Sequence, residues 1–353
     1  MQRRDRPRTG SDLPGLDLAE RQAWQHYLEA VLRFDAALNR LLNAEHQLSV
    51  IDLRVLDILA KSAGGSARMG DLSDALGTTR RQMTKRVDRL EERGLVRRGT
   101  DPRDRRGVAA LIADDGRNIV DQARNTYARG VADYLLASLT PRQVNSVAEN
   151  CWRINRALGN GDPDESTFPE APTCYLPGVN DAGKRCWHEF LESSEALGPL
   201  LSDRLVAAHQ LTLIDVLLLD RIAKYPRGSM PLSRLGEAFA LAPSRVTQQV
   251  TRLEVQGLVL RGPGPGDRRR VVVTVTPRGR ARLGPALALY AKEIRRNFLD
   301  PMSRQQAIAL GDACRRISVP GKPGADRPAR AGRRSSSVAV AATIDAAAPV
   351  VTL

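Results

Sequence analysis

The chain repeats itself at a fixed offset of 163 residues, and this repeat limits its fold more than any other feature of the sequence. Between residues 84 and 108, 15 of 25 positions are identical, without a gap, to the residues found 163 positions later. Unrelated segments would agree at about one or two of these positions. The same offset pairs Trp24 with Trp187 and Cys151 with Cys314. The duplicated unit is therefore a whole domain, and the chain must build one fold twice.

The stretch from residue 79 to residue 93 predicts a helix. Thr79 can cap its N-terminus, with Gln82 as the reciprocal partner three residues later. Three apolar residues follow at spacings of four and three and predict one buried stripe, namely Met83, Val87 and Leu90. The opposite face is basic and carries Arg80, Arg81, Thr84 and Lys85. Gly94 stands where a left-handed residue would end the helix.

The residues after Gly94 predict a charged hairpin. Residues 95–98 and 107–109 read as two short strands, and the turn formers at 101–104 lie between them. A basic helix followed by a basic hairpin indicates a winged helix. The expected fold class is mainly α with small β wings (α+β), in two tandem winged helix-turn-helix domains.

The charge of the chain favours a polyanionic partner. Lys and Arg number 54 against 40 Asp and Glu, a net charge of +14. The excess is concentrated, since residues 80–106 carry 11 basic and 5 acidic side chains and residues 243–270 carry 6 and 2. Aromatic residues make up only 4% of the chain, which disfavours stacking on single-stranded bases and favours duplex DNA.

Nothing in the sequence predicts a membrane span or a secretory signal, and we expect a cytoplasmic protein associated with the nucleoid through DNA. The four cysteines include no C-x-x-C pair and indicate reduced thiols. The four histidines lack metal-ligand spacing, so we expect no metal, no cofactor and no enzymatic activity. His46 and its repeat His209 favour a local hydrogen bond, with a ligand contact as the alternative. Cys151 and Cys314 favour buried packing over a thiol switch.

Composition and periodicity divide the chain into five parts. The predicted parts are a disordered basic arm (1–17), a first winged-helix domain (18–158), a linker (159–182), a second winged-helix domain (183–318) and a disordered tail (319–353). In the first domain, the predicted helices cover residues 18–43, 48–61, 69–76, 79–93, 114–136 and 140–158. The second domain follows this plan, but Pro285 falls inside its fifth helix and should kink that helix or delay its start.

Each copy resembles the multiple antibiotic resistance regulator (MarR) family of winged helix-turn-helix transcription factors. The first copy carries the resemblance in Leu72-x-x-Ala75-Leu76, in Val87-Asp88-Arg89-Leu90-Glu91 followed by Gly94-Leu95-Val96, and in Asp101-Pro102-Arg103-Asp104-Arg105-Arg106. The second copy carries it in Leu232-x-x-Leu235, Thr251-Arg252-Leu253-Glu254, Gly257-Leu258-Val259 and Asp267-Arg268-Arg269. The resemblance covers about 270 of the 353 residues.

The resemblance implies that the helix at 79–93 lies in the major groove of DNA. We expect Arg81, Gln82 and Lys85 to contact base edges, because Arg can grip guanine and Gln adenine with two hydrogen bonds. We expect Thr84 to contact a phosphate and Arg80 to share the same face. The equivalents in the second copy are Ser244, Arg245, Gln248 and Thr247. Because the two sets differ, the predicted operator is an imperfect palindrome.

The resemblance also implies that the wing tip enters the minor groove. In the family an acid orients an arginine there, which assigns Asp104 and Asp267 as orienting acids and Arg103, Arg105, Arg106, Arg268 and Arg269 as DNA contacts. A salt-bridged surface hairpin is the alternative. The second copy departs from the family pattern, since Gly262-Pro263-Gly264-Pro265-Gly266 replaces the usual loop.

The sequence therefore favours a sequence-specific regulator of transcription that binds double-stranded DNA, most simply a repressor. The family implies a small aromatic effector that binds between the dimerisation helices and the DNA-reading domain. A duplicated chain can supply both halves of a dimer, so we favour a single-chain pseudo-dimer over a homodimer. The alternative is a winged-helix module that binds protein or a ligand and does not itself bind DNA.

Overall fold

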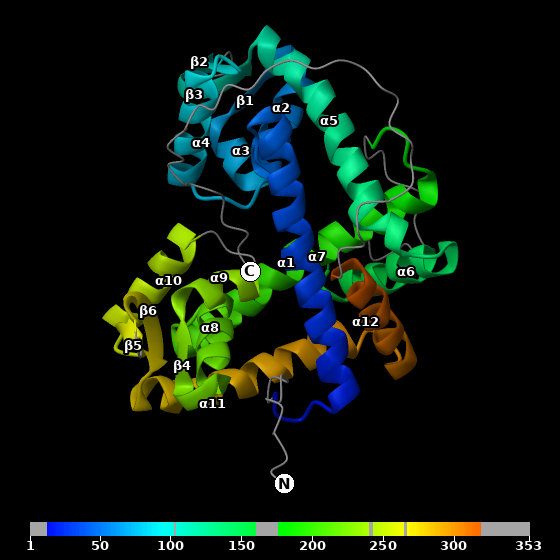
Figure 1. Cartoon of the computed structure of the whole chain (residues 1–353). Helices are drawn as coiled ribbons and strands as arrows, with labels where there is room; N and C mark the ends of the chain where they lie inside the picture. Colours follow the sequence, from blue (N-terminus) through cyan, green and yellow to red (C-terminus); the bar gives the residue numbers. More distant parts are fainter. Residues whose placement is uncertain (1–12, 102–103, 160–175, 240–242, 265–266, 319–353) are drawn as a thin grey trace, which may run out of the picture.

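The computed structural model describes residues 13–101, 104–159, 176–239, 243–264 and 267–318. It is mainly helical, with one small antiparallel sheet in each copy, as the sequence predicts (Figure 1). Among the described residues, no helix has the length and apolar character that crossing a membrane requires.

The first copy consists of six α-helices, three strands and two 3-10 turns. Their bounds are α1 Leu18–His46, α2 Val50–Lys61, η1 Ala63–Gly65, β1 Ser66–Arg68, α3 Met69–Ala75, α4 Arg80–Glu92, β2 Val96–Asp101, β3 Asp104–Ile112, α5 Asp114–Tyr134, η2 Leu136–Ser138 and α6 Pro141–Ala157.

The second copy repeats this order. Its elements are α7 Asp181–His209, α8 Leu213–Lys224, η3 Pro226–Gly228, β4 Ser229–Pro231, α9 Leu232–Phe239, α10 Pro243–Val255, β5 Val259–Gly264, β6 Asp267–Val275, α11 Pro277–Ile294, a π-helical turn η4 Arg295–Leu299 and α12 Arg304–Ser318.

Each sheet has three strands, one more than the sequence predicts. In the first copy β3 pairs with β2 on one side and with β1 on the other, so that Ala110 lies opposite both Arg98 and Ala67. The second sheet has the same order, β4-β6-β5. The strand β1 is only three residues long and lies between a 3-10 turn and a helix, too short to show an alternating pattern.

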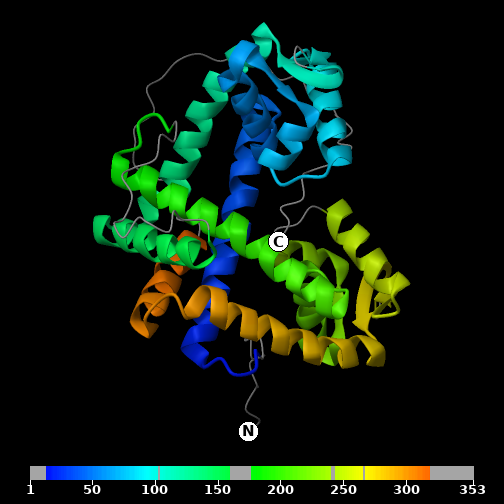
Figure 2. The same ribbon diagram turned by 180° about the vertical axis from the view of Figure 1, so that it is seen from behind.

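The two copies pack against each other through their terminal helices. The first helix of each copy lies along the last helix of the other, α1 with α12 and α7 with α6 (Figures 1 and 2). Polar contacts cross this layer: Asn155 Nδ2 donates to Glu189 Oε2 at 2.8 Å, and Arg295 Nη2 lies 2.8 Å from Glu20 Oε2. A Cβ atom at Gly311 of α12 would overlap the backbone of Ala23 in α1. The helices of this layer therefore approach closely.

The start of the chain corrects one sequence prediction. Leu13 and Leu16 fall at the end of the predicted disordered arm, but both are buried. Their segment is tied to the second copy, because Arg295 Nη2 donates to the carbonyl oxygen of Gly15 at 2.8 Å. Apolar burial and this hydrogen bond offset the ordering entropy that composition alone predicted would leave the segment free. Residues 1–12 and the predicted tail at 319–353 lie outside the described part of the chain.

The helix around Pro285 also differs from one of the two predicted outcomes. The helix α11 starts at Pro277, directly after the N-cap Thr276, and continues through Pro285. Its start is not delayed, because proline is favoured at the first helical position. The missing hydrogen bond at Pro285 is tolerated in a helix whose neighbours Leu283, Ala286 and Leu287 are buried.

Candidate nucleic-acid interface

The recognition helix of the first copy, α4, begins where the sequence predicts. Thr79 is its N-cap, and Thr79 and Gln82 form a capping box. The Oε1 atom of Gln82 accepts from the backbone N of Thr79 at 3.1 Å and from its Oγ1 at 2.9 Å. Gly94, with φ of 69°, follows the helix as the left-handed residue. Gripping adenine with both amide atoms would require Gln82 to release this cap.

The burial of α4 separates an apolar side from a basic side. Met83, Val87 and Leu90 are buried in the core. Arg80, Arg81, Thr84 and Lys85 are exposed, so the structure brings the predicted contact residues together on one open face. The hydroxyl of Thr84 donates to the carbonyl oxygen of Arg80 at 2.9 Å, which leaves its oxygen able to accept a further hydrogen bond.

A buried ion pair that the sequence analysis missed fixes α4 against α2. Arg86 is only 4% exposed, and its Nη1 lies 2.7 Å from Asp52 Oδ1 and 3.1 Å from Ser49 Oγ. Ser49 is also the N-cap of α2. The signal was available, because Arg86 falls between Met83 and Val87 on the stripe that faces the core.

The second copy makes the same connection from a different position. Arg252 Nη2 lies 2.5 Å from Oδ2 of Asp215, which is fully buried at the start of α8. Asp215 is the repeat of Asp52, but Arg252 is the repeat of Arg89, and Gln249 stands at the repeat of Arg86. The two recognition helices are therefore anchored to the same acid through different turns.

Each wing is fixed to its recognition helix by an arginine on its first strand. In the first copy Arg98 contacts Asp88 and Glu91, and its backbone N donates to Glu91 Oε1 at 3.0 Å. In the second copy Arg261 binds Glu254, with Nε donating to Oε2 at 2.7 Å. This hydrogen bond from Arg261 holds the pKa of Glu254 below its usual value. Both wings therefore have a base of defined orientation.

The wing tips themselves lie outside the described residues. Arg103 has no described position, and the strands β3 and β6 are described there without their side chains. This applies to the remaining predicted wing residues Asp104, Arg105, Arg106, Asp267, Arg268 and Arg269.

The recognition helix of the second copy, α10, presents a different face. Ser244, Thr247 and Gln248 are exposed, and the Thr247 hydroxyl donates to the carbonyl oxygen of Pro243 at 2.9 Å. Arg245 is half-buried and interacts electrostatically with Asp35 of α1 in the first copy. Burial lowers the pKa of the Arg245 guanidinium, and the charge of Asp35 opposes this shift. Of the four predicted contacts on α10, Arg245 is therefore directed to the other copy.

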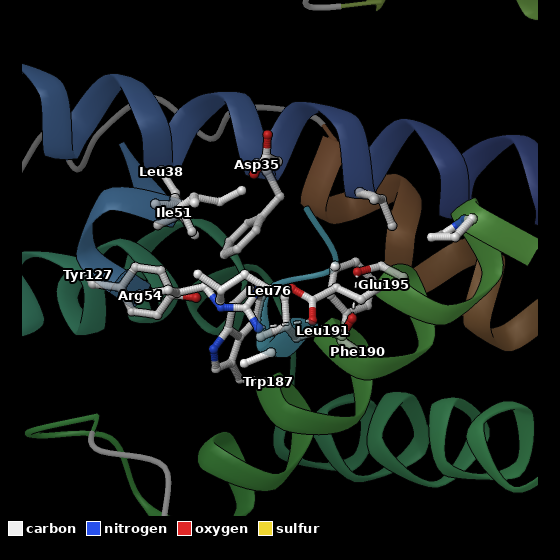
Figure 3. Close-up of a pocket in the computed structure, with 17 residues that line it drawn as sticks. Asp35, Leu38, Ile51, Arg54, Leu76, Tyr127, Trp187, Phe190, Leu191 and Glu195 are labelled. Carbon is white, nitrogen blue, oxygen red and sulfur yellow. Dashed lines mark hydrogen bonds and ion pairs between the residues drawn. The ribbon is translucent and has the colours of Figure 1, made fainter. Parts of the chain in front are cut away.

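Asp35 lies in the wall of a cavity between the copies. The cavity measures about 280 Å³ and is bounded by α1, α2 and α5 of the first copy and by α7 of the second (Figure 3). Burial raises the pKa of the Asp35 carboxyl to about 6, and the charge of Arg245 limits the shift. Arg54 of α2 and Glu195 of α7 form an ion pair across the same cavity.

The paired histidines and cysteines take structural positions. His46 Nε2 hydrogen-bonds Thr126 Oγ1 at 2.8 Å, the local contact that the sequence favoured. Cys151, Cys186 and Cys314 are buried free thiols, and burial raises the pKa of each, that of Cys186 to about 12. A raised pKa disfavours the reactive thiolate. Within the described part of the chain, no group of three or more His, Cys, Asp or Glu side chains could hold a metal ion.

Comparison with known proteins gives the same family for both copies. MarR family models match residues 46–107 and residues 211–271. The uncharacterized HTH-type transcriptional regulator YfiV of Bacillus subtilis (strain 168) is 26% identical over 41% of this chain and 88% of its own length. The HTH-type transcriptional regulator MhqR of the same organism is 26% identical over 28% of this chain and 67% of its own.

Among solved structures, the chain is similar to Sco3205, a MarR family transcriptional regulator from Streptomyces coelicolor crystallised in complex with DNA. The identity is 29%, the match covers 43% of this chain and 97% of Sco3205, and the TM-score is 0.37. The two family matches fall 163 to 165 residues apart, at the spacing of the internal repeat. The chain belongs to the MarR family and carries two tandem copies of its winged helix-turn-helix domain.

Proposed function

We propose that this protein is a sequence-specific regulator of transcription that binds double-stranded DNA, most simply as a repressor acting in the cytoplasm on the nucleoid. The observation that carries the proposal is the face of α4, where Arg80, Arg81 and Lys85 are exposed together. The helix beneath this face is fixed by the Arg86–Asp52 ion pair. A rigid helix with basic side chains near its N-terminus suits entry into the major groove. The regulators named above, which share the family, support the same assignment.

We propose that Arg81 and Lys85 contact base edges and that Arg80 and Thr84 contact phosphates. Gln82 contributes to base recognition through its amide NH₂, because its Oε1 is held by the cap. On α10 the proposed contacts are Ser244, Thr247 and Gln248, with Arg245 joining them if it leaves Asp35. The proposed minor-groove contacts remain the arginines of the two wings, oriented by Asp104 and Asp267. These unequal sets favour an imperfect palindrome as operator.

We propose further that one chain forms a pseudo-dimer, with domains at residues 18–158 and 183–318 joined by the linker at 159–182. The exchange of first and last helices between the copies supports this proposal. Dimeric helix-turn-helix proteins place their two recognition helices about one helical turn apart, roughly 34 Å, and a duplication supplies both helices in one polypeptide.

A small aromatic effector that relieves repression is part of the proposal. The cavity beside Asp35 lies between the helices that join the copies and the helices α2 and α3 of the first DNA-reading domain. Aromatic rings line it, including Phe34, Tyr127 and Trp187 (Figure 3). A ligand in this position could bias the placement of that domain relative to the rest of the chain.

Duplex binding at several salt concentrations tests the proposal. Fragments selected from genomic DNA by the purified chain supply the operator, and fluorescence anisotropy measures its affinity. We expect affinity to fall log-linearly with salt, because released counterions drive phosphate binding. Arg81→Ala should weaken discrimination at one base pair by about 1 to 3 kcal/mol.

Arg142→Ala is the matched control, since it removes the same charge from an exposed position on α6, away from the recognition helix. The control should leave operator affinity within about twofold of the parent chain. Equal effects of the two substitutions, or duplex affinity that does not respond to salt, would refute the assigned interface.

The second copy has features that favour a second candidate function, the binding of another protein. Its recognition helix ends in Val255, which is 84% exposed, and its wing exposes Leu260 at 60%. The repeats of these residues in the first copy are Glu92 and Arg97, both charged. An apolar surface at this place suits protein contact better than contact with phosphates. Substitution of both residues by their first-copy counterparts would leave duplex affinity unchanged if they serve a protein partner.

A further inference from the structure

The internal repeat creates two related sites between the copies, and the structure shows them in different states. Each site lies where the first helix of one copy crosses the other copy's first helix and fifth helix. A tryptophan marks each one, Trp24 on α1 and Trp187 on α7, exactly one repeat apart along the sequence. The tyrosine that faces each tryptophan is also repeated, as Tyr290 on α11 and Tyr127 on α5.

The site at Trp24 is closed by its own side chains. Trp24 Nε1 donates to the hydroxyl of Tyr290 at 2.7 Å, and both residues are buried. The ring of Phe298 packs edge-on to Trp24, with 5.0 Å between the ring centroids. Every polar atom of the Trp24 indole is satisfied within the protein. This site has neither an unpartnered donor nor a need for a ligand.

The site at Trp187 is open. Trp187 is 3% exposed and lines the cavity of about 280 Å³ beside Asp35. Its Nε1 is buried with no hydrogen-bond partner among the described residues. The ring of Tyr127 lies edge-on at 5.8 Å between centroids, and the position of Phe298 is taken by the smaller Leu135. An indole N–H buried without an acceptor costs free energy that a ligand could recover.

Polar side chains occur at the open site and are missing from its repeat. Asp35, Arg54 and Glu195 line the cavity at Trp187, whereas the corresponding residues are Gly198, Leu217 and Leu32. Arg54 is already paired with Glu195 across the two copies. The Asp35 carboxylate is the remaining charge in the wall, so an anionic ligand would face repulsion there.

We propose that the chain binds one ligand, at the Trp187 site alone, and that this ligand is an uncharged aromatic molecule with a hydrogen-bond acceptor for Trp187 Nε1. The aromatic walls Phe34, Phe190 and Tyr127 accommodate a flat ring, and the free N–H selects the acceptor. The inference deepens the effector role in the proposed function and rests on it for any effect on DNA. Ligand binding itself does not require that the chain bind DNA.

Calorimetric titration of the full chain with three probes of one ring system tests the proposal. The probes are 2-acetylnaphthalene, which is neutral with a carbonyl acceptor, naphthalene, which has no acceptor, and 2-naphthoate, which is anionic. We expect one 2-acetylnaphthalene per chain, bound about fivefold or more tighter than either of the others. Two bound molecules per chain, a preference for 2-naphthoate, or equal affinity for naphthalene would overturn the proposal.

Two variants of matched position locate the site. Trp187→Phe keeps a ring and removes the N–H, so its affinity for 2-acetylnaphthalene should drop to that of naphthalene. Trp24→Phe is the repeat of this change and should leave ligand affinity unaltered. Ser194→Phe, which fills the cavity from α7, should abolish binding of every probe and stands in if Trp187→Phe does not fold. Undiminished binding by Ser194→Phe would place the ligand elsewhere.

The same titration is repeated with the operator duplex present. Binding of 2-acetylnaphthalene without any change in duplex affinity would remove its role as effector and leave the ligand site intact. Absence of probe binding by a chain that still binds the duplex would overturn the ligand site and leave the DNA-binding function intact.

Discussion

The recognition helix of the first copy presents Arg80, Arg81 and Lys85, whereas the corresponding residues of the second are Pro243, Ser244 and Gln248. Yet the two helices rest on the same scaffold, each tied to an aspartate near the start of the preceding long helix and each bound to its wing through an arginine. The duplication has therefore kept the internal contacts that hold a winged helix together. The surfaces that meet partners have diverged, and the first copy carries more of the positive charge.

The largest expected effect concerns a feature that the copies share. Gly116 and Gly279 follow the wings at the starts of α5 and α11, where an added Cβ would overlap the carbonyl oxygens of Leu95 and Leu258. We expect Gly116→Ala and Gly279→Ala each to lower the free energy of unfolding by about 2 to 3 kcal/mol, because backbone atoms cannot move aside cheaply. Chemical denaturation measures both.

The control for this pair is Gly284→Ala in α11, where an added Cβ meets nothing within 4 Å. This change should stabilise the chain by up to about 1 kcal/mol, since alanine favours helix. Strongly unequal losses for Gly116→Ala and Gly279→Ala would show that the two scaffolds are not equivalent.

The second prediction concerns the surfaces that differ. Arg81→Ala should cost about 1 to 3 kcal/mol of operator binding, while the repeat position, Ser244→Ala, should cost less than about 0.5 kcal/mol. An exposed arginine brings charge and two hydrogen bonds to a base, and a serine brings one weaker contact. Anisotropy titrations with one duplex compare the two variants. Equal losses would mean that both copies read DNA with the same strength.

The third prediction uses Asp35, which has glycine as its repeat. Its folded-state pKa of about 6 lies above the ordinary 3.8, so the folded protein binds this proton more tightly than the unfolded chain. The stabilisation from Asp35 is therefore full below pH 4 and is lost as the pH rises to about 6. Asp35→Asn should remove this loss, so that the variant gains about 1 to 2 kcal/mol relative to the parent between pH 4 and pH 7.

Urea unfolding at several pH values checks this prediction, with Asp133→Asn at an exposed position of α5 as the control. A constant difference in stability between Asp35→Asn and the parent across this range would contradict the assigned environment of the carboxyl.

The smallest expected effect concerns the ion pair between the copies. Arg54 and Glu195 are 35% and 44% exposed, and their repeats are Leu217 and Leu32. Arg54→Leu, Glu195→Leu and the double variant form a cycle whose coupling energy should stay below about 1 kcal/mol, because solvent screens the pair. A larger coupling would show that this pair controls how the copies dock.

The sequence was sufficient to predict the winged helices, because the cap at Thr79, the stripe at Met83 and Val87 and the glycine at 94 are local signals that agree. It also predicted which side of α4 is exposed. It could not predict that Arg245 lies beside Asp35, since the two residues are 210 positions apart and their approach depends on how the copies pack. The buried ends of Leu13 and Leu16 were missed for the same reason.

The candidate ligand site was beyond sequence reasoning for a related cause. Trp187 reads as an ordinary core residue in the pattern of its helix, and so does Trp24. Only the side chains around each tryptophan separate them, and these come from both copies: Tyr290 satisfies one indole and leaves the other without a counterpart. Such differences arise from millimetric adjustments of packing at the atomic scale, which the periodicity of a sequence does not record.

Sedimentation of the purified chain, alone and with one operator duplex, tests the central claim that a single polypeptide supplies both halves of the DNA-binding unit. The account predicts a species of 38.6 kDa at micromolar concentration that binds the duplex one to one. A stable species of about 77 kDa, twice the chain mass of 38.6 kDa, that binds the duplex as two chains would contradict it.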